Sequence, residues 1–302
     1  MNRLINVTAL YADHGIPTAP ATNKHFSQEW VNTHCPFCEG SKNFHLGYHR
    51  AGGYFHCYRC GWKPTRLALA GILGTSERVA WDVARQYFAR RNAGFANTPE
   101  ITPPVIHTYL PRGTIEISSN HAAYLRNRGF DPKALVRTWK LKGTGPTAKP
   151  QWRWRIVIPI YHDRHLVSYT TRAMSDRGDK YRACPKEQEL LHHRHTLYGL
   201  DLAPGPVAIV VEGPVDVWRI GPGAVATFGT EVKPAQRVLL SRFKKLIIAF
   251  DSDSHGAGQK AGEKLAWQMS GMGVETEQVL LPMGVDPGSL SENQVNVLRH
   301  ML

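Results

Sequence analysis

The sequence has no long apolar stretch. VAIVV (207–211) and LIIAF (246–250) are among its longest uninterrupted apolar runs, whereas a transmembrane helix needs about 20 such residues. The amino-terminal segment MNRLINVTALYADHG also lacks the basic-then-apolar order of a secretory signal. These two absences argue against a membrane-spanning or secreted protein, and we expect the chain to act inside the cell.

A nucleotide-motor motif is also missing. The phosphate-binding loop G-x-x-x-x-G-K-[ST] does not occur, and the glycine-rich stretches GTGPTAK (143–149) and GAGQKAG (256–262) do not match it. The chain has no internal repeat and no low-complexity tract. The sequence therefore argues against an NTP-driven motor domain.

Acidic residues are scarce and unevenly placed. The chain has 37 Lys and Arg against 24 Asp and Glu, a net charge of +13. Residues 121–200 hold 16 basic and 6 acidic residues, which is +10, and residues 201–302 hold 9 and 11, which is −2. A basic middle beside a carboxylate-bearing end suits a protein that grips a polyanion and binds cations next to it. A merely soluble basic surface is the alternative.

Cysteine is rare, and four of the five cysteines form two Cys-x-x-Cys pairs separated by 18 residues. In an intracellular chain such pairs indicate a metal site rather than disulfides. Two knuckles of this kind complete a tetrahedral shell of four sulfur atoms, and zinc is the ion that such a shell favours. We therefore expect structural Zn²⁺ bound by Cys35, Cys38, Cys57 and Cys60.

Aromatic and basic residues surround these cysteines in the sequence: Tyr48, Tyr54, Phe55, Tyr58, Arg59, Trp62 and Lys63. They suit stacking on unpaired bases and contacts with phosphate, although for any one of them a place in a small core is the alternative. His34 and His56 adjoin the knuckles and are interpreted as surface or outer groups, because four cysteines already complete the shell. Cys184 is interpreted as an ordinary free thiol.

Patterns along the chain predict a multi-domain α+β protein. Short strands and knuckles are expected over 27–62, and helices over 64–90, where Ser76 can cap the second one. Four prolines and little periodicity mark 92–117 as a linker. Two short helices broken at Gly129, and paired strands around HDRH (162–165), predict a mixed α+β basic subdomain over 118–203.

From residue 204 onward, strand-like and helix-like segments alternate. This alternation predicts a small α/β domain with a largely parallel sheet over 204–302. The expected division is therefore a zinc-binding domain at 1–91 with its ribbon at about 27–62, the linker, the basic subdomain and the α/β domain.

Acidic residues follow three predicted strands of the α/β domain. Glu212 follows AIVV, Asp251 and Asp253 follow LIIAF, and Asp286 follows the last strand, while Asp216 comes four residues after Glu212. In open α/β sheets, ligands bind beyond the carboxyl ends of the strands. Clustered carboxylates repel one another unless cations neutralise them, and hard oxygen ligands select Mg²⁺ or Mn²⁺. Turn and capping roles are the alternative, most of all for Asp286.

Three motifs together resemble a Toprim domain, which bacterial primases, some topoisomerases and several nucleases share. They are VVEGPVDV (210–217), DSD (251–253) and GVDP (284–287). The ordered set narrows the family. After the zinc ribbon come YLRNRGF (124–130), RIVIPI (155–160), KYRACP (180–185), LYGL (197–200), AVATFGT (224–230) and AGQKA (257–261). This order resembles DnaG-type primases, and in pattern most closely the primase part of phage primase-helicases, over nearly the whole chain from about residue 30.

The resemblance implies a DNA-dependent RNA polymerase that makes short RNA primers from NTPs on a single-stranded DNA template. Such an enzyme would act in the cytoplasm of a bacterium or of a phage-infected cell, with a replicative helicase on another chain as an expected partner. By position, the resemblance assigns catalysis to Glu212, Asp251 and Asp253. It assigns the Mg²⁺ or Mn²⁺ site to these three together with Asp216 and Asp286. The basic positions that it places at the nucleotide and template channel are Arg155, Arg172, Lys180, Arg182 and Lys260.

The sequence departs from the family pattern in several places. Two residues are inserted after Asp253, Gly288 stands where bacterial primases often carry an acid, and the chain ends soon after the Toprim motifs, which leaves no room for a helicase domain. Two other functions stay open: a Toprim-type metal-dependent nuclease, and a non-catalytic single-stranded DNA-binding replication protein. A topoisomerase would need a longer chain.

A group of three histidines precedes LYGL, at positions 192, 193 and 195. Three neighbouring imidazoles could hold a metal ion. Because Arg194 lies among them, the segment is instead interpreted as a solvated or phosphate-facing turn.

Overall fold

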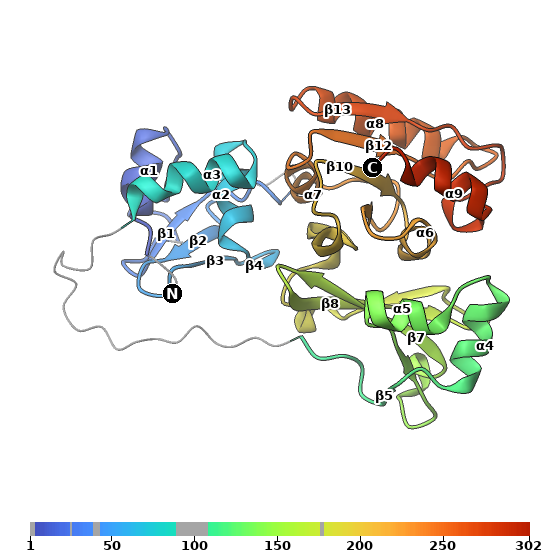
Figure 1. The fold of residues 1–302 in the computed structure, drawn as a ribbon. Helices are drawn as coiled ribbons and strands as arrows, with labels where there is room; N and C mark the ends of the chain where they lie inside the picture. The colour runs from blue at the N-terminus through green and yellow to red at the C-terminus, as the bar shows by residue number, and fades with distance from the viewer. Residues whose placement is uncertain (1–3, 25, 39–42, 89–107, 176–177) are drawn as a thin grey trace. The chain divides into compact units, whose positions relative to one another are not determined.

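The computed structural model describes residues 4–24, 26–38, 43–88, 108–175 and 178–302 (Figure 1). The chain divides into two compact units, one comprising residues 1–106 with 233–242, the other residues 107–232 with 243–302. Of the predicted linker (92–117), residues 92–107 lie outside the described part of the chain, and residues 108–113 form neither helix nor strand.

The first unit contains a small antiparallel sheet. Its strands pair in chain order: β1 (Trp30–Thr33), β2 (Leu46–His49), β3 (Tyr54–Cys57) and β4 (Gly61–Lys63). The helices of this unit are α1 (Val7–Asp13), α2 (Thr65–Leu73) and α3 (Glu77–Ala84), and α7 (Pro234–Leu240) groups with it. Every residue of β2 is buried, so this inner strand is covered on both faces.

The helices of the first unit begin and end at residues that favour those positions. Ser76 caps α3 by accepting a hydrogen bond from the backbone N–H of Val79 at 3.4 Å. Gly74 ends α2 with φ 64°, a left-handed conformation that glycine adopts without steric cost. The helices expected over 64–90 are confirmed up to residue 84, after which Arg85–Tyr87 form a single 3-10 turn.

The second unit begins with a five-stranded antiparallel sheet in the order β5 (Thr114–Ile115), β6 (Lys142–Thr144), β7 (Arg155–His162), β8 (His165–Ala173) and β9 (Tyr181–Ala183). The predicted hairpin turn is confirmed: Asp163 and Arg164 have φ of 50° and 64°, as a tight two-residue turn requires. Their backbone N–H groups donate to the carboxylate of Asp201 at 3.0 and 2.7 Å. The helices α4 (Ser119–Asn127) and α5 (Pro132–Trp139) precede β6, with the predicted break between them.

The second sheet of this unit is parallel, as the alternating pattern predicted. Its strand order is β11 (Ala224–Ala226), β10 (Val207–Val211), β12 (Lys245–Ile248) and β13 (Glu275–Gln278). The helices α6 (Pro214–Ile220), α8 (Ala257–Ser270) and α9 (Glu292–Arg299) belong to the same part of the chain. Ile209 on β10 and Ile247 on β12 are fully buried, which is typical of parallel strands covered on both faces.

One apolar core joins the two sheets of the second unit. It includes Ile156 and Ile158 of β7, Leu125 of α4, and Ile209 and Ile247 of the parallel sheet. Because these side chains pack in one continuous cluster, the edge formed by β8 and β9 is held in a fixed position relative to the ends of β10 and β12. Among the described residues, no helix is long and apolar enough to cross a membrane.

Candidate functional site

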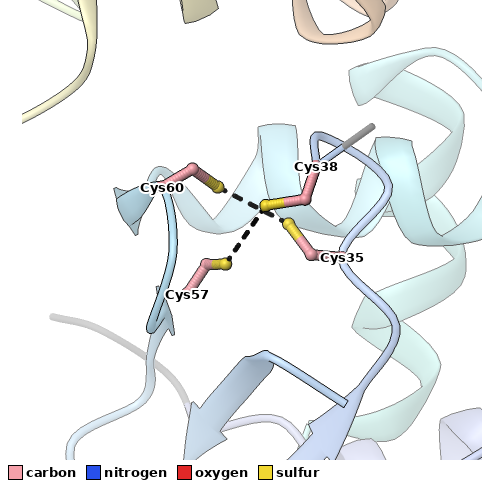
Figure 2. Close-up of side chains that lie close together, drawn as sticks. All are labelled: Cys35, Cys38, Cys57 and Cys60. Atoms are coloured by element: carbon pink, nitrogen blue, oxygen red, sulfur yellow. Dashed lines mark hydrogen bonds between the residues drawn. The ribbon is translucent and has the colours of Figure 1, made fainter. Parts of the chain in front are cut away.

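The four paired cysteines come together at one end of the first unit's sheet (Figure 2). Cys35 and Cys38 lie after β1, Cys57 ends β3 and Cys60 precedes β4. The Sγ atoms of Cys35 and Cys60 are 3.6 Å apart, as are those of Cys38 and Cys57. A tetrahedral ion with metal–sulfur bonds of about 2.3 Å needs sulfur atoms about 3.8 Å apart. The cluster therefore fits a closed, structural metal site.

The aromatic residues near the cluster divide into core and surface. Tyr48 and Phe55 are buried, with exposed fractions of 1% and 0%, so they fill the core, whereas Tyr58 is 52% exposed. Trp30 contacts His49 and Tyr54 edge to face, with ring centroids 4.8 and 5.6 Å apart. The exposed ring is the one that could stack on an unpaired base.

Lys63 does not take the phosphate-facing position that its place in the sequence indicated. Its side chain is fully buried, and Nζ donates to the carbonyl oxygen atoms of Cys60 at 2.6 Å and Trp62 at 3.2 Å. A buried ammonium group that donates to backbone carbonyls stabilises the second cysteine knuckle. This correction reassigns Lys63 from binding to structure.

In the second unit, the carboxyl ends of two adjacent parallel strands bring acidic side chains together. Glu212 follows β10 and Asp251 lies three residues beyond β12. The backbone N–H of Asp251 donates to Oε1 of Glu212 at 3.1 Å. Asp216 on α6 is 8% exposed, and its two oxygen atoms accept from the N–H groups of Gly213 at 2.9 Å and Gly288 at 3.1 Å.

These carboxylates line a pocket of about 410 Å³. The residues around it come from the end of α4, the antiparallel sheet, the 3-10 turn His193–His195, α6 and the loops that follow the parallel strands: Arg128, Thr170, Arg172, Lys180, Tyr181, Ala183, His193, Glu212, Gly213, Pro214, Val215, Asp216, Phe228, Gly229, Asp251 and Asp286. The structure thus brings four of the five predicted carboxylates to one cavity.

Asp253, the fifth, is not among the lining residues of this pocket. Its side chain is exposed, and Oδ1 accepts from the backbone N–H groups of His255 at 2.8 Å and Ala257 at 3.1 Å. The bonds from Ala257 and its neighbours lower the pKa of Asp253. In this structure Asp253 holds the loop that begins α8, and its predicted catalytic role stays a prediction.

Burial and mutual repulsion raise the pKa of three carboxyl groups in the pocket. Burial, and then the charge of Asp251, raise the pKa of Glu212 to about 7. The same two causes raise the pKa of Asp216 to about 7. Burial and Asp286 raise the pKa of Asp251 to about 6, although Lys180 opposes the shift. Carboxyl groups that hold protons near neutral pH are groups that a cation would stabilise in their charged form.

Two further features fit a divalent cation at this rim. Among the described residues, Oδ1 of Asp251 is buried and has no hydrogen-bond partner. A Cβ atom at Gly258 would lie 2.1 Å from the carbonyl oxygen of Asp251 and 2.9 Å from Oε1 of Glu212, so the start of α8 closes tightly on the carboxylates. An unsatisfied oxygen within a set of hard oxygen donors fits an ion such as Mg²⁺ or Mn²⁺.

Gly288 contributes to the site through its backbone. Its N–H donates to Asp216, and a Cβ atom there would lie 2.8 Å from Oδ1 of Asp216 and 3.1 Å from Oδ1 of Asp286. The glycine that departs from the family pattern is therefore the residue that allows the chain to approach Asp216 so closely.

The predicted basic residues divide into two groups. Lys180 and Arg172 line the pocket, and Arg172 donates to the hydroxyl oxygen atoms of Tyr124 and Tyr181, both at 2.7 Å. Arg155, Arg182 and Lys260 are not among the lining residues.

Each of these three has another place in the structure. Arg155 is buried and donates to Thr171 Oγ1 at 2.7 Å and to the carbonyl oxygen of Asp179 at 2.8 Å. Arg182 pairs with Asp179 at 2.7 Å, and Lys260 is exposed on α8. Arg155 therefore supports the segment that carries Lys180, and nucleotide contact by these three residues stays a prediction.

Among the polar side chains that line the pocket, Arg128, Thr170 and Tyr181 were not assigned from the sequence. Arg128 belongs to the motif YLRNRGF and Tyr181 to the motif KYRACP. The sequence therefore indicated both motifs as functional but did not indicate which of their residues line the pocket. Thr170 lies within β8, where nothing in the strand pattern indicates which side chain faces the pocket.

Comparisons with known proteins agree with this architecture. Residues 209–291 match the family model described as Toprim-like. A DNA primase from Aquifex aeolicus is 30% identical over 300 residues, covering 84% of this chain and 59% of that protein. A DNA primase from Deinococcus radiodurans is 31% identical over 176 residues, covering 54% of this chain and 30% of that protein. The chain thus spans less than two thirds of the length of each of these relatives.

Solved structures share the fold. The crystal structure of the Aquifex aeolicus primase, with its zinc-binding and RNA polymerase domains, gives a TM-score of 0.54 at 21% identity and covers 98% of this chain and 82% of that one. A DnaG primase catalytic domain bound to single-stranded DNA gives a TM-score of 0.52 at 21% identity, over 61% of this chain and 72% of that one.

The parallel sheet with carboxylates at its carboxyl edge is therefore a Toprim-like domain. Together with the four-cysteine module and the basic antiparallel sheet that precede it, it makes this chain a relative of the DnaG-type DNA primases.

Proposed function

We propose that the protein is a DNA primase, a template-dependent polymerase that makes short RNA primers on single-stranded DNA. The observation that carries this proposal is the single pocket in which Glu212, Asp216 and Asp251 face Lys180 and Arg172. Such a pocket offers hard oxygen ligands for a metal ion and cationic groups for a triphosphate within one cavity. The likeness to bacterial primases supports the same reaction.

In the proposed reaction, the 3′-hydroxyl of one ribonucleotide attacks the α-phosphorus of the next, and pyrophosphate leaves. Glu212, Asp251 and Asp286 would hold Mg²⁺ or Mn²⁺, with Asp216 behind them and Asp253 joining if its loop opens. A bound divalent ion supplies charge neutralisation at phosphorus and activates the attacking oxygen. Lys180 and Arg172 would bind and orient the triphosphate through charge-assisted contacts.

The remaining parts would handle the template. We assign residues 1–91 as the zinc-binding domain, 92–117 as the linker, 118–203 as the basic subdomain and 204–302 as the Toprim domain. The exposed ring of Tyr58 would stack on template bases, and Arg182 would contact template phosphates. Lys260 would act as a further phosphate contact, while Arg155 would act by positioning Lys180.

The proposal includes the setting of the enzyme. NTPs are its substrates, Zn²⁺ is the ion at the four cysteines, and a replicative helicase on another chain is the expected partner. A primase works where DNA is replicated, so we propose a cytoplasmic location.

A primer-synthesis assay tests this function. The protein is incubated with NTPs or dNTPs, Mg²⁺ or Mn²⁺, and a library of single-stranded templates, and the products are sized and sequenced. We expect oligoribonucleotides, and we expect Asp251→Asn to lower their yield at least about 100-fold, because it removes a charged oxygen ligand. Glu263→Gln is the matched control, because Glu263 is an exposed carboxylate on α8, and should keep full yield.

Two other results would replace the proposal. Metal-dependent cleavage of the template without NTPs would identify a Toprim-type nuclease. Template binding with neither synthesis nor cleavage, on every template and with both metals, would identify a non-catalytic replication protein.

A further inference from the structure

A second group of metal-ligating side chains lies in the segment before LYGL. Glu189, His192 and His193 place one ligand atom each within 4.8 Å of one another. These residues precede and form a single 3-10 turn, His193–His195. The group lies in the second unit, so it is separate in the chain from the four cysteines, and only His193 belongs to the lining of the carboxylate pocket.

The burial of the Glu189 side chain distinguishes this group from a turn on the surface. Its side chain is only 1% exposed. Oε1 accepts from Ser168 Oγ at 2.7 Å and lies 2.7 Å from Nδ1 of His193. Oε2 is buried and, among the described residues, has no hydrogen-bond partner. It lies 3.8 Å from Nε2 of His192, beyond hydrogen-bond distance.

A buried carboxylate oxygen without a partner costs free energy, so native structures usually supply one. The side chains of His192 and His193 are only 24% and 17% exposed, which is less than a fully solvated turn would show. An ion pair with His193 gives Oε1 of Glu189 a partner but leaves Oε2 without one. A cation between Oε2 and the two imidazoles would satisfy it.

We propose that Glu189, His192 and His193 form a binding site for a transition-metal ion of the zinc class, such as Zn²⁺ or Co²⁺. Imidazole nitrogen suits these ions, whereas Mg²⁺ prefers oxygen ligands and water. A tetrahedral ion with bonds of about 2.0 Å needs ligand atoms about 3.3 Å apart. The separation of Oε2 from Nε2 of His192 is 3.8 Å, and that of Oε1 from Nδ1 of His193 is 2.7 Å, so these two pairs lie on either side of this value and the carboxylate would bind the ion through both oxygen atoms. The ion would replace the proton between His193 and Glu189, and water would complete its shell.

Ser168 acts as the outer partner of this site. Its hydroxyl donates to Oε1 of Glu189 from β8 and so fixes the carboxylate plane, as outer-shell groups do at known metal sites. The ring of His193 also lines the carboxylate pocket and contacts Phe228 edge to face, with ring centroids 5.4 Å apart. A bound ion would therefore fix the orientation of this ring at the side of the pocket. This inference does not depend on the proposed polymerase activity.

Cobalt binding tests the proposal. The full-length protein, with zinc at its cysteines, is titrated with Co²⁺ in excess Mg²⁺, which competes at the carboxylate rim, and visible absorption is recorded. We expect one further Co²⁺ per chain, with the weak visible bands of nitrogen and oxygen ligands. The strong near-ultraviolet bands of cobalt thiolate would instead report exchange at the cysteines.

The variants identify the ligands. His192→Asn should weaken Co²⁺ binding at least about 10-fold to 100-fold, and Ser168→Ala should weaken it within that range. His192→Asn should fold normally, because Asn can replace the ring that caps the turn by accepting from Arg194 N–H at 3.2 Å, and circular dichroism checks this. His165→Asn, at an exposed histidine, is the matched control and should bind as the unaltered protein does.

Two results would overturn the proposal. One is an unaltered protein that takes up no Co²⁺ beyond its cysteines. The other is a folded His192→Asn variant that binds Co²⁺ as tightly as the His165→Asn control.

Discussion

At Gly258 the main chain of α8 comes so close to the metal-site carboxylates that it excludes any side chain. A Cβ atom there would lie 2.1 Å from the carbonyl oxygen of Asp251. We expect Gly258→Ala to lower the free energy of unfolding by about 1–3 kcal/mol, as overpacking does, and to displace Asp251. Urea denaturation and the primer assay measure the two effects. Gly271→Ala is the control, because its Cβ would have only ordinary contacts at 3.5 Å; equal stability of both variants would contradict the argument.

The raised pKa values at Glu212 and Asp216 predict a pH-dependent stability in the metal-free protein. Because the folded-state pKa values of about 7 exceed the ordinary values of 4.5 and 3.8, the folded state binds protons more tightly than the unfolded state. The stabilisation is therefore fully present below about pH 4 and is lost as the pH rises through about 7. A tenfold change in an acid dissociation constant corresponds to about 1.4 kcal/mol, so the effect at the buried Asp216 carboxyl is on the order of a few kcal/mol.

Thermal unfolding of the zinc-loaded protein without added Mg²⁺ or Mn²⁺, at about pH 5 and about pH 8, measures this difference. We expect Mg²⁺ or Mn²⁺ to restore stability at the higher pH, because the ion neutralises the carboxylates. Asp216→Asn should reduce the pH dependence. An unchanged pH dependence in that variant would show that Asp216 does not have its raised pKa.

At the scale of elements, the four strands of the first unit are too short to hold together without a crosslink. They have three or four residues each, and two of the three turns around them carry cysteines. We expect a strong chelator to unfold this sheet while the second unit stays folded, because structural zinc modules depend on their metal. Limited proteolysis of the full chain followed by mass spectrometry locates the cuts, which should fall within residues 27–62.

Two variants sharpen this test. Cys57→Ser should reproduce the effect of the chelator without any chelator. Cys184→Ser should leave the zinc content unchanged, since Cys184 is buried in the second unit. Cuts that appear equally in both units would contradict an independent, metal-dependent module.

The elements themselves could be predicted from the sequence because their signals are local. Cysteine spacing defines the knuckles, Ser76 defines a helix start, and the carboxylates that follow parallel strands meet at one edge by topology. Side-chain burial could not be predicted in the same way. Lys63 and Glu189 look like surface residues in the sequence, and only long-range packing puts them inside.

Hydrogen bonding between distant segments was equally hidden. Arg155 bonds to a loop 24 residues further along the chain, and no pattern around it indicates that partner. Asp253 was expected to face the metals with Asp251, and the sequence did not indicate that its Oδ1 would accept from N–H groups of its own loop; its catalytic role stays a prediction. The hydrogen-bond partners of these side chains depend on which donors and acceptors the fold brings near them. The periodicity of apolar residues in the sequence does not contain that information.

At the scale of the whole molecule, the uneven charge predicts how template binding responds to salt. Residues 121–200 carry +10, and phosphate contacts from this segment would release counterions from the DNA. For a single strand, the slope of log K against log salt changes by about 0.7 for each phosphate contact. We therefore expect Arg182→Ala to weaken binding and to make the slope shallower by about 0.7. Lys264→Ala, at an exposed lysine on α8, should leave both unchanged. Fluorescence anisotropy with a labelled oligonucleotide over a range of salt concentrations gives the slopes, and identical slopes for Arg182→Ala and Lys264→Ala would mean that Arg182 does not hold the template.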